Sequence, residues 1–569
     1  MLARTSSAAV LALGEPRFSD PELAALQQHE GDIAAWRKAW SLHAGMAPQR
    51  ATGAFAIALS HDDGGAFLAV DRFAIHTLCY RVVGNTLHFA ERADELSAGL
   101  GNERDGVGPE LDPQAIFDYL YFHCIPSPRT VFKDVFRVPP GHSVSFKDGQ
   151  LTVAPYWLAE FIEPSPAVSF DALKSEFRTL FRDAVGGALD GGTPACFLSG
   201  GTDSSTVAGM IRQATGKAAH TYSIGFEAEG YDEMAYARLA ARHFGSEHHE
   251  YYVTPADLVQ SIDDVATSYD QPFGNSSALP AYYCALKAKH DGVTRVLAGD
   301  GGDELFGGNS RYAKQRVFGW WNHLPSALRG AVLEPIFMNG RVARAPLLKK
   351  GTSYIEQAKV GMPQRLQMYN LLLRLGTADV LTPAFLALVD QSGPGTQQRE
   401  VWNLARTGEE LNRTLAYDWR YTLAESDLPK VNGTTRLADI QVRYPFLAQT
   451  VLDFSLKLPV DYKLKGLKLR WFFKEALRGF LPDQIITKKK QGFGLPFGVW
   501  LMRHEALKKF VFDSLTSLST RGVIRPEFIE LLIRQRLPEH PGYYGEMAWI
   551  LMMLEQWLQS HVPKWRLIS

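Results

Sequence analysis

The chain has 569 residues, of which 46% are hydrophobic and 21% charged, and its formal net charge is −1. This length exceeds a single hydrophobic core and predicts about three or four domains. A balanced charge gives no global electrostatic reason to bind nucleic acid or anionic lipid. The sequence lacks an apolar run long enough to span a membrane, and its four cysteines are widely spaced, without a CxxC pair. We therefore expect a cytoplasmic protein with no nucleic-acid partner.

The first predicted domain, residues 1–157, is rich in strands. Residues 53–73 and 141–157 each alternate apolar and polar side chains on both sides of a turn sequence, which is typical of β-hairpins. The short apolar run before Glu15 favours a buried strand over a signal peptide. Residues 158–170 contain two prolines and no periodic pattern, and we interpret them as a linker.

The pattern changes in residues 171–569. Short β-rich runs such as "PACFL", "HTYSIGF", "HHEYYV" and "VTRVLA" alternate with helical stretches, including residues 232–244 and 255–269. Such alternation predicts a doubly wound parallel sheet over about 190–310. Strand signals fade afterwards, so about 311–569 should be mostly helical. The predicted class is α/β.

The stretch "CFLSGGTDSS" ends an apolar strand and precedes a helix. Its glycines allow a ligand close to the backbone, and the N–H groups of the loop and helix N-terminus would face an anion. Asp203 would repel a bare phosphate but suits a site in which Mg²⁺ lies between carboxylate and phosphate. The same residues also fit an ordinary strand-to-helix turn with a capping side chain.

A second stretch, "VLAGDGGDELFGG", also follows a predicted strand. It places Asp300, Asp303 and Glu304 among glycines, and the mutual repulsion of three carboxylates is offset by a shared divalent cation. Two such loops at the ends of two strands of one sheet predict one site for Mg²⁺ and a polyphosphate. The GxxxxGK[ST] and GxGxxG phosphate-binding motifs are absent.

These motifs resemble a known family. "SGGTDSS" is similar to the SGGxDS pyrophosphate loop of N-type ATP pyrophosphatases, and the order "SIGF", "HHE", "PFGNSSALP", "GDGGDELFGG", "RYPFL", "QGFGLPFGVWL" resembles the synthetase half of class B asparagine synthetases. Upstream, "GAFAIALS", "DRFAIHTLCYR", "FAERADEL" and "VPPGHSVSF" resemble the later strands of that family's glutaminase domain. The resemblance implies a truncated Ntn-hydrolase-like β-rich domain followed by an ATP pyrophosphatase domain.

The chemistry implied by this resemblance uses ATP and Mg²⁺. A substrate carboxylate attacks the α-phosphate of ATP, releasing pyrophosphate, and an amine or ammonia then displaces AMP to form an amide. The site must neutralise charge on the leaving pyrophosphate and align two reactants.

The resemblance also implies roles for individual residues. The expected pyrophosphate cradle is Ser199, Gly200, Gly201, Ser204 and Ser205. The expected metal ligands are Asp203 and Asp303. The expected adenosine contacts are Leu198, Ser223, Ile224, Gly225 and Gly299. Asp300 should lie near the adenylate, and Lys490 should stabilise developing negative charge. We set His248 and His249 aside as metal ligands, because a strand-end pair lacks a third ligand.

Two departures from the family pattern bear on function. Position 2 is Leu2, where family glutaminases carry their nucleophilic cysteine, so we expect no glutamine hydrolysis. The N-terminal domain would then be a degenerate scaffold, or a docking surface for a partner or second copy.

The second departure concerns the substrate. "KVNGTTRLADIQVRYPFLA" replaces the family's KVDRMSM and LEVRVPFLD, and we assign Asn432, Gln441 and Arg443 to an altered substrate pocket. β-Lactam synthetases and lasso-peptide cyclases are relatives of this kind.

Three hypotheses remain open. The first is an ATP-dependent amide ligase acting on a carboxylate and an amine. The second is an asparagine synthetase that uses free ammonia or a partner glutaminase. The third is a nucleotide-binding pseudoenzyme that regulates a partner, against which the retention of Asp203, Asp303 and Lys490 argues.

Overall fold

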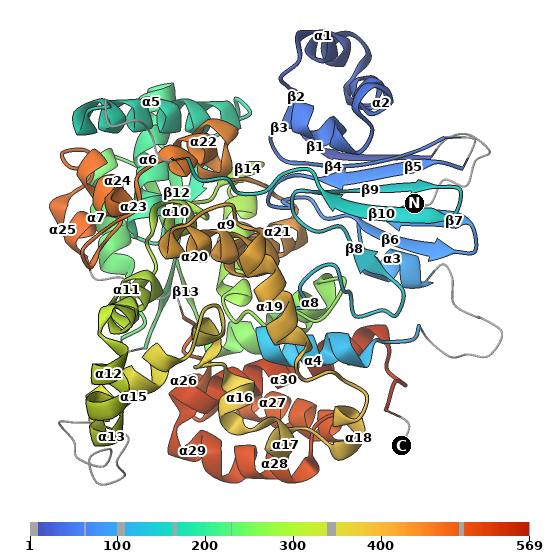
Figure 1. Ribbon diagram of the computed structural model, residues 1–569, viewed down its shortest axis with the longest axis vertical. Coiled ribbons are helices and arrows are strands. Elements are labelled where there is room, and N and C mark those ends of the chain that lie inside the picture. Colours follow the sequence, from blue (N-terminus) through green and yellow to red (C-terminus); the bar gives the residue numbers. More distant parts are fainter. Residues whose placement is uncertain are drawn as a thin grey trace.

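The computed structural model describes residues 9–61, 64–98, 109–162, 168–228, 230–337, 349–488 and 494–567. A β-rich part, a parallel-sheet part and a helical part follow one another along the chain (Figure 1), which confirms the predicted α/β class. None of the helices in these ranges combines the length and apolar character that a membrane span requires.

A five-stranded antiparallel sheet organises the N-terminal part. Its strands lie in the order β1 (Val10–Gly14), β4 (Phe55–Ser60), β5 (Ala66–Val70), β9 (His142–Lys147) and β10 (Gln150–Pro155). The pairs β4–β5 and β9–β10 are the two predicted hairpins. The second turns through Asp148 and Gly149, with φ angles of 50° and 77°; residues 62–63 of the first turn lie outside the described residues. Strand β1 is present but only partly buried.

Smaller elements complete the N-terminal part. They are β2 (Arg17–Phe18), α1 (Pro21–Glu30), α2 (Asp32–His43), η1 (Ala44–Arg50), β3 (Ala51–Thr52), β6 (Cys79–Val83), β7 (Thr86–Ala90), α3 (Ala93–Ala98), α4 (Pro113–Phe122) and β8 (Phe136–Arg137). Helix α2 inserts the buried ring of Trp36 between Phe18 and Phe55, at 5.0 Å from each ring. On the other face, Leu68 packs with Tyr80 of the three-stranded sheet β7-β6-β8.

The second part is built on five parallel strands. They lie in the order β13 (Glu247–Val253), β12 (His220–Phe226), β11 (Ala195–Phe197), β14 (Arg295–Leu297) and β15 (Gln441–Arg443). The chain runs outward from β11 to β13 and then returns to β14 on the other side of β11. Because parallel crossovers are right-handed, the helices before and after this reversal cover opposite faces. The carboxyl ends of β11 and β14 therefore form the switch point of the sheet, where ligands of such sheets bind.

Helices separate the strands of the parallel sheet as expected. They are α5 (Phe170–Ala188), α6 (Thr202–Thr215), α7 (Met234–Phe244), α8 (Pro255–Ser268), α9 (Ala278–His290) and α10 (Gly302–Phe306). Helices α7 and α8 confirm two predicted helices with slightly shorter ends. The sequence pattern missed β15, because three residues without flanking strand signals are too short to show a period of two.

Helices dominate the rest of the described chain. They are α11 (Ser310–His323), α12 (Ser326–Leu328), η2 (Arg329–Leu333), α13 (Glu334–Phe337), α15 (Lys349–Lys359), η3 (Gln364–Gln367), α16 (Leu371–Leu375), α17 (Thr377–Val380), α18 (Pro383–Leu386), α19 (Gly393–Leu404), α20 (Glu410–Asp418), η4 (Trp419–Asp427), α21 (Leu428–Leu437), η5 (Pro445–Leu447), α22 (Gln449–Lys457), α23 (Val460–Lys463), α24 (Trp471–Ala476), α25 (Asp483–Thr487), α26 (Phe497–Leu501), α27 (Glu505–Ser519), α28 (Pro526–Leu531), η6 (Leu532–Arg536), α29 (Leu537–Glu539) and α30 (Pro541–His561). A small hairpin, β16 (Leu464–Lys465) with β17 (Lys468–Leu469), interrupts them.

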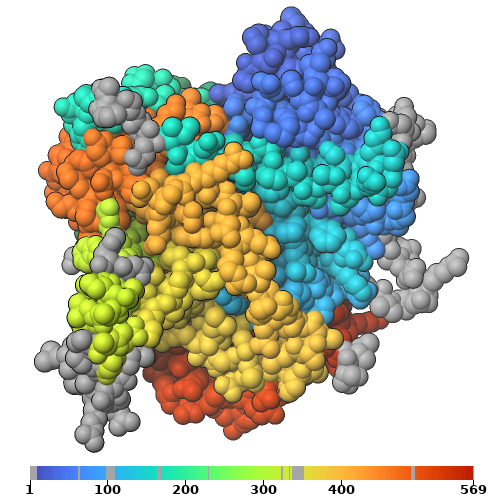
Figure 2. Space-filling view, viewed as in Figure 1, coloured from blue at the N-terminus to red at the C-terminus, as the bar shows by residue number. Residues whose placement is uncertain are grey.

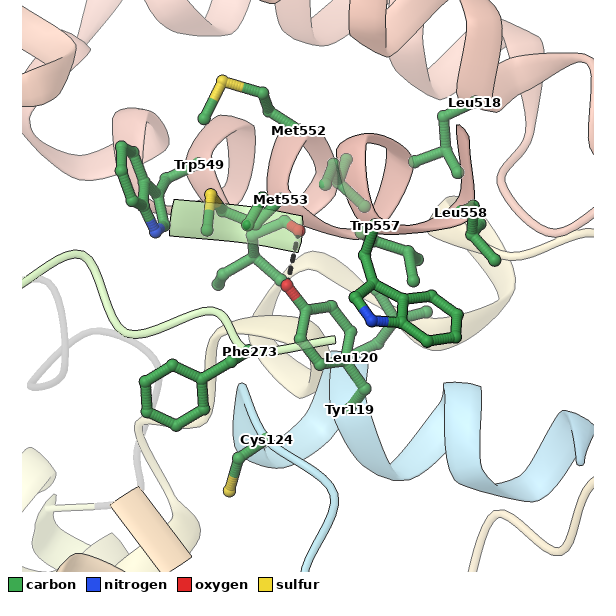
Figure 3. Close-up of a cluster of buried hydrophobic side chains, with 14 of the residues drawn as sticks. Tyr119, Leu120, Cys124, Phe273, Leu518, Trp549, Met552, Met553, Trp557 and Leu558 are labelled. Carbon is green, nitrogen blue, oxygen red and sulfur yellow. Dashed lines mark hydrogen bonds between the residues drawn. The ribbon is translucent and has the colours of Figure 1, made fainter. Parts of the chain in front are cut away.

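One hydrophobic cluster joins the N-terminal part to the last helices. Helix α4 packs against α30, and the hydroxyl of Tyr119 donates to the carbonyl of Ile550 at 2.8 Å. Figure 3 shows Tyr119 and Leu120 facing Met553 and Trp557 of α30. Figure 2 shows the blue and cyan N-terminal part in direct contact with yellow and orange segments of the helical part. The domain limits at 157 and 171 remain a prediction, and the hydrophobic core extends across them.

Candidate active site

A cavity of about 780 Å³ opens at the switch point of the parallel sheet. It is lined by the loops after β11 and β14, by the start of α21 and by the segment after β17. The side chains that bear on its chemistry are Ser199, Asp203, Ser204, Asp300, Asp303, Glu304, Asp427, Lys430, Arg470, Lys474 and Lys488. The cavity lies where the two acid- and glycine-bearing loops were expected to meet.

The loop after β11 is closed by its own hydroxyl groups. The N–H of Ser199 donates to Oγ of Ser204 at 3.1 Å, and the two hydroxyl oxygens lie 3.0 Å apart. Gly200 has φ of 70°, and a Cβ there would lie 2.5 Å from the backbone nitrogen of Ala237 in α7. The close packing of the loop against α7 thus requires glycine at this position, whether or not a ligand also approaches the backbone there.

The loop after β14 lies against the first loop. A Cβ on Gly299 would come within 3.0 Å of the backbone nitrogen of Ser204, and a Cβ on Gly302 would overlap the carboxylate of Asp203. Helix α10 begins at Gly302 immediately after this contact. Because Gly299 and Gly302 have no side chains, the carboxylate of Asp203 can pack against the backbone that carries Asp303.

Arg470 joins the two predicted metal ligands. Its Nη1 lies 2.9 Å from Oδ2 of Asp203 and 2.9 Å from Oδ1 of Asp303, and it donates to Oγ1 of Thr202 at 2.7 Å. Its Nη2 also pairs with Asp203. The guanidinium stacks over the ring of Phe473 at 4.3 Å and is nearly inaccessible to solvent. Both carboxylates thus face one cation position inside the cavity.

A second ion-pair group lies at the start of α21. The ammonium of Lys430 is 3.0 Å from Asp427 and 3.8 Å from Asp300. Burial raises the pKa of Asp300 to about 6, although the charge of Lys430 opposes this effect. Burial disfavours the ammonium of Lys430, but Asp427 and Asp300 outweigh burial and raise its pKa. The ammonium of Lys430 is thus held beside Asp300, the residue expected near the adenylate.

Glu304 is a buried carboxyl in the same wall. Burial raises its pKa to about 8, and the negative charges of Asp427 and Asp418 act in the same direction. Its side chain is therefore largely protonated at neutral pH. Because Glu304 is protonated, the cavity carries less negative charge than its number of carboxyl groups would give. This lower negative charge favours an anionic ligand.

Most of the predicted ATP-binding residues line this cavity, and some do not. Those that line it are Leu198, Ser199, Gly201, Asp203, Ser204, Ser223, Ile224, Gly299, Asp300 and Asp303. Gly200, Ser205 and Gly225 are not among the lining residues: Gly200 packs against α7, Ser205 is fully buried in α6, and Gly225 packs against the ring of Tyr252. Lys490 lies outside the described residues.

Sequence reasoning missed Arg470 and Lys430. Arg470 follows the β16–β17 hairpin in a left-handed conformation, φ 55°, and reaches Asp203 across 267 residues of chain, so no local pattern indicates it. Lys430 had a signal, because it is the lysine of "KVNGTT" that persists from the family's KVDRMSM.

The three residues predicted for the substrate pocket lie in a different cavity. Asn432, Gln441 and Arg443 line a space of about 690 Å³ between the N-terminal part and the parallel-sheet part, with α21 separating it from the first cavity. Asn432 donates to the carbonyl of Ile75 at 2.7 Å and accepts from the hydroxyl of Tyr444 at 2.7 Å.

The charged groups of this second cavity are paired across the interface. Arg443 pairs with Glu15, which also accepts from Arg295 at 2.8 Å. Arg436 pairs with Glu91 at 2.8 Å. The structure therefore uses Asn432 and Arg443 to join the two parts, and it brings neither side chain into the cavity of Asp203 and Asp303.

Comparison with known proteins adds a family assignment to this geometry. The family model described as asparagine synthase matches residues 176–559, and the model described as glutamine amidotransferase domain matches residues 37–157. Glutamine-hydrolyzing asparagine synthetase 1 of Bacillus subtilis (strain 168) is 24% identical over 526 residues, 91% of this chain and 79% of the relative.

Two further relatives differ in their printed names. A glutamine-hydrolyzing asparagine synthetase of Sandersonia aurantiaca is 35% identical over 185 residues, 30% of this chain and 34% of that protein. Amidase chry2 of Gibberella zeae is 24% identical over 481 residues, 79% of this chain and 70% of that protein. Similarity thus extends over most of the chain, and the printed names are asparagine synthetase for two of these relatives and amidase for the third.

Proposed function

Since the chain belongs to the asparagine synthase family and is an ATP-dependent carbon–nitrogen ligase of that type, we propose that it adenylates a substrate carboxylate and transfers the acyl group to an amine or ammonia. The observation that carries this proposal is the convergence of Asp203 and Asp303 on one cation position at the switch point of the sheet. The loop of Ser199 and Ser204 beside them supplies N–H and hydroxyl groups suited to a pyrophosphate.

Two steps account for the product. A carboxylate oxygen attacks the α-phosphorus of ATP, the bond to the β-phosphate oxygen breaks, and pyrophosphate leaves. The amine nitrogen then attacks the acyl carbon, the carbon–oxygen bond to AMP breaks, and the nitrogen loses a proton. Arg470 and Lys430 place fixed positive charge on two sides of the cavity, which suits a reaction that accumulates negative charge on pyrophosphate.

The donor set fits Mg²⁺. Asp203 and Asp303 offer carboxylate oxygens, the ligands that Mg²⁺ prefers, and both already face a single cation, the guanidinium of Arg470. These two residues would hold the ion, which supplies charge neutralisation on the phosphates. Asp300 and Lys430 would orient the adenylate.

The body of the acyl or amine substrate would extend into an adjoining cavity of about 550 Å³. The two cavities are neighbours at two places along the chain. Ser310 and Asp427 line the first cavity, and the adjacent residues Arg311 and Ser426 line the second. The adjoining cavity is lined by the rings of Tyr121, Phe122, Tyr369, Tyr417, Tyr421 and Tyr543. Arg311 in its wall is paired with Asp418 at 3.0 Å, and burial raises the pKa of Glu546, so the lining suits an uncharged, ring-bearing group.

Glutamine is not proposed as the nitrogen source. The thiols of Cys79, Cys124, Cys196 and Cys284 are all buried. Burial raises the pKa of Cys79 and of Cys196 to about 12, so neither thiol supplies a nucleophilic thiolate at neutral pH. The N-terminal part would act as a scaffold that contacts α21 and α30, or as a surface for a partner or second copy.

Product analysis tests the proposal. The protein is incubated with ATP, Mg²⁺, ammonium and a panel of carboxylates that includes aspartate and acids bearing aromatic or sugar rings. We expect carboxylate-dependent AMP and pyrophosphate, and a loss of about 100-fold or more in Asp303→Asn. Activity with aspartate alone would support a strict asparagine synthetase. ADP as product, or no turnover across the panel, would contradict the proposal and favour a nucleotide-binding regulator.

A further inference from the structure

Histidines gather at the edge of the parallel sheet opposite to the ATP cavity. His220 is the first residue of β12 and Glu247 is the first residue of β13, and the two are direct partners in the strand register. His249 lies two residues further along β13, on the same face as Glu247. The strand register thus brings three possible ligands, His220, Glu247 and His249, onto one face of the sheet.

The distances between these groups suit one metal ion. Nε2 of His220 lies 3.3 Å from one carboxylate oxygen of Glu247, and Nε2 of His249 lies 3.6 Å from the other. The three ligand atoms lie within 4.8 Å of one another. A tetrahedral zinc site with bonds of about 2.0–2.1 Å separates its ligands by about 3.4 Å. The two imidazole rings are stacked, with centroids 5.6 Å apart and planes 14° apart, so both rings lie on the same face of the two strands.

Both ring nitrogens of His249 face carboxylates. Its Nδ1 lies 3.0 Å from Oδ2 of Asp291, a carboxylate that only accepts hydrogen bonds, so the proton belongs on Nδ1. Nε2 faces a second carboxylate, that of Glu247, at 3.6 Å, an arrangement that a metal ion bound between them would stabilise. This nitrogen is buried, without a hydrogen-bond partner among the described residues. The arrangement of carboxylate, histidine and metal is a common one around zinc.

We propose that His220, Glu247 and His249 bind one Zn²⁺ ion, with Asp291 orienting His249. Two imidazoles and one carboxylate favour zinc over Mg²⁺, and a three-residue set leaves a fourth position for water. The ring of Tyr222 stacks on His249 at 4.8 Å and fixes its plane. The site lies at the amino ends of β12 and β13, away from Asp203, and would tie the edge strand to its neighbour.

His248 provides a matched control. Its side chain points to the opposite face of β13, where Nδ1 lies 2.9 Å from Oγ1 of Thr221 and Nε2 lies 3.5 Å from Glu250. A histidine adjacent in the chain is therefore outside the proposed site. Replacing either histidine removes one imidazole from the protein, and only one of the two replacements removes a ligand.

Zinc titration of the full chain tests the site. Tag-free protein is stripped with a chelator, saturated with Mg²⁺ and ATP to fill the other cavity, and titrated with Zn²⁺ by calorimetry. We expect one saturable site, lost in His249→Gln, unchanged in His248→Gln and weakened by about 10–100-fold in Asp291→Asn. Cobalt(II) should give the intense visible bands of a four-coordinate ion.

Two results would overturn the proposal. One is the absence of saturable zinc binding. The other is equal binding by His248→Gln and His249→Gln. If His249→Gln does not fold, Glu247→Gln decides, because that side chain is 60% exposed and its replacement leaves the core intact. None of these variants alters the ATP cavity.

Discussion

The two cavities on either side of α21 contain similar side chains and differ in how their charges are paired. In the cavity at the switch point, two carboxylates from different loops share the guanidinium of Arg470, and a buried carboxyl, Glu304, stays protonated. In the cavity at the domain interface, Arg443 and Arg436 each face an acidic residue of the N-terminal part. Charges gathered within one cavity indicate a site for charged reactants, whereas charges paired across an interface indicate attachment. The comparison predicts that variants of the first cavity change chemistry and that variants of the second change stability.

The largest expected effect is that of Arg470→Gln. Removal of the guanidinium takes away the cation that Asp203 and Asp303 share and should lower the free energy of unfolding by about 3 kcal/mol. Urea unfolding with chelator and with saturating Mg²⁺ measures it. Mg²⁺ should restore part of the loss, because it binds the same two carboxylates. Arg470→Lys is the control and should lose less. A loss that is identical with and without Mg²⁺ would show that these carboxylates do not share a cation.

Glu304→Gln should alter the pH dependence of stability. Folding raises the pKa of Glu304 from 4.5 to about 8, so the folded chain binds more protons than the unfolded chain in this range. The stability of the wild type therefore falls as pH rises from about 4.5 to about 8. The variant should lose this slope and be more stable than the wild type at pH 8.

Urea unfolding at pH 5.5 and pH 8 measures this effect. Glu176→Gln, on the exposed face of α5, is the control and should leave the slope unchanged. If Glu304→Gln instead destabilises the protein at both pH values, the side chain is ionised in the folded state and the charge balance inferred for the cavity is wrong.

Asn432→Ala tests the second cavity. The variant loses hydrogen bonds to Ile75 and Tyr444, so stability should fall by about 1–2 kcal/mol while KM for the substrates changes by less than about 2-fold. Thermal unfolding and steady-state kinetics on the same preparation separate the two outcomes. A large rise in KM at unchanged stability would support the substrate role expected from the sequence.

Gln441→Ala should have the smallest effect. The exposed amide oxygen of Gln441 accepts from Arg295 at 2.9 Å, and Arg295 keeps its contact with Glu15 in the variant. The free energy of unfolding should change by less than about 0.5 kcal/mol, and kcat/KM should not change. A change of substrate preference in this variant would place the substrate on the interface side of α21.

The sequence predicted that the two acid- and glycine-bearing loops meet, and the structure brings them together. This prediction was possible because both signals were local. Each loop follows its own apolar strand, and the topology of parallel sheets brings the carboxyl ends of neighbouring strands together. Sequence reasoning could not find Arg470, whose role depends on a left-handed residue after a short hairpin far along the chain. Asn432 was assigned to the substrate pocket from its position in a sequence motif. Only the structure shows that its amide donates to the carbonyl of Ile75.

The histidine cluster illustrates the same limit. Along the sequence, His248 and His249 look like a pair, yet alternation along β13 sends them to opposite faces. The side chains that approach His249 are His220, from the neighbouring strand, and Asp291, from the end of α9. Strand register and helix placement decide both contacts, and neither follows from a local pattern.

Oxygen transfer from the carboxylate tests the central claim most directly. A substrate acid identified in the product assay is labelled with ¹⁸O in its carboxylate and turned over with ATP and the amine. The account predicts one ¹⁸O atom in the phosphate of AMP, because a carboxylate oxygen attacks the α-phosphorus and remains there when the amide forms. Label in inorganic phosphate, or AMP without label, would contradict adenylation at the loop of Ser199 to Ser204.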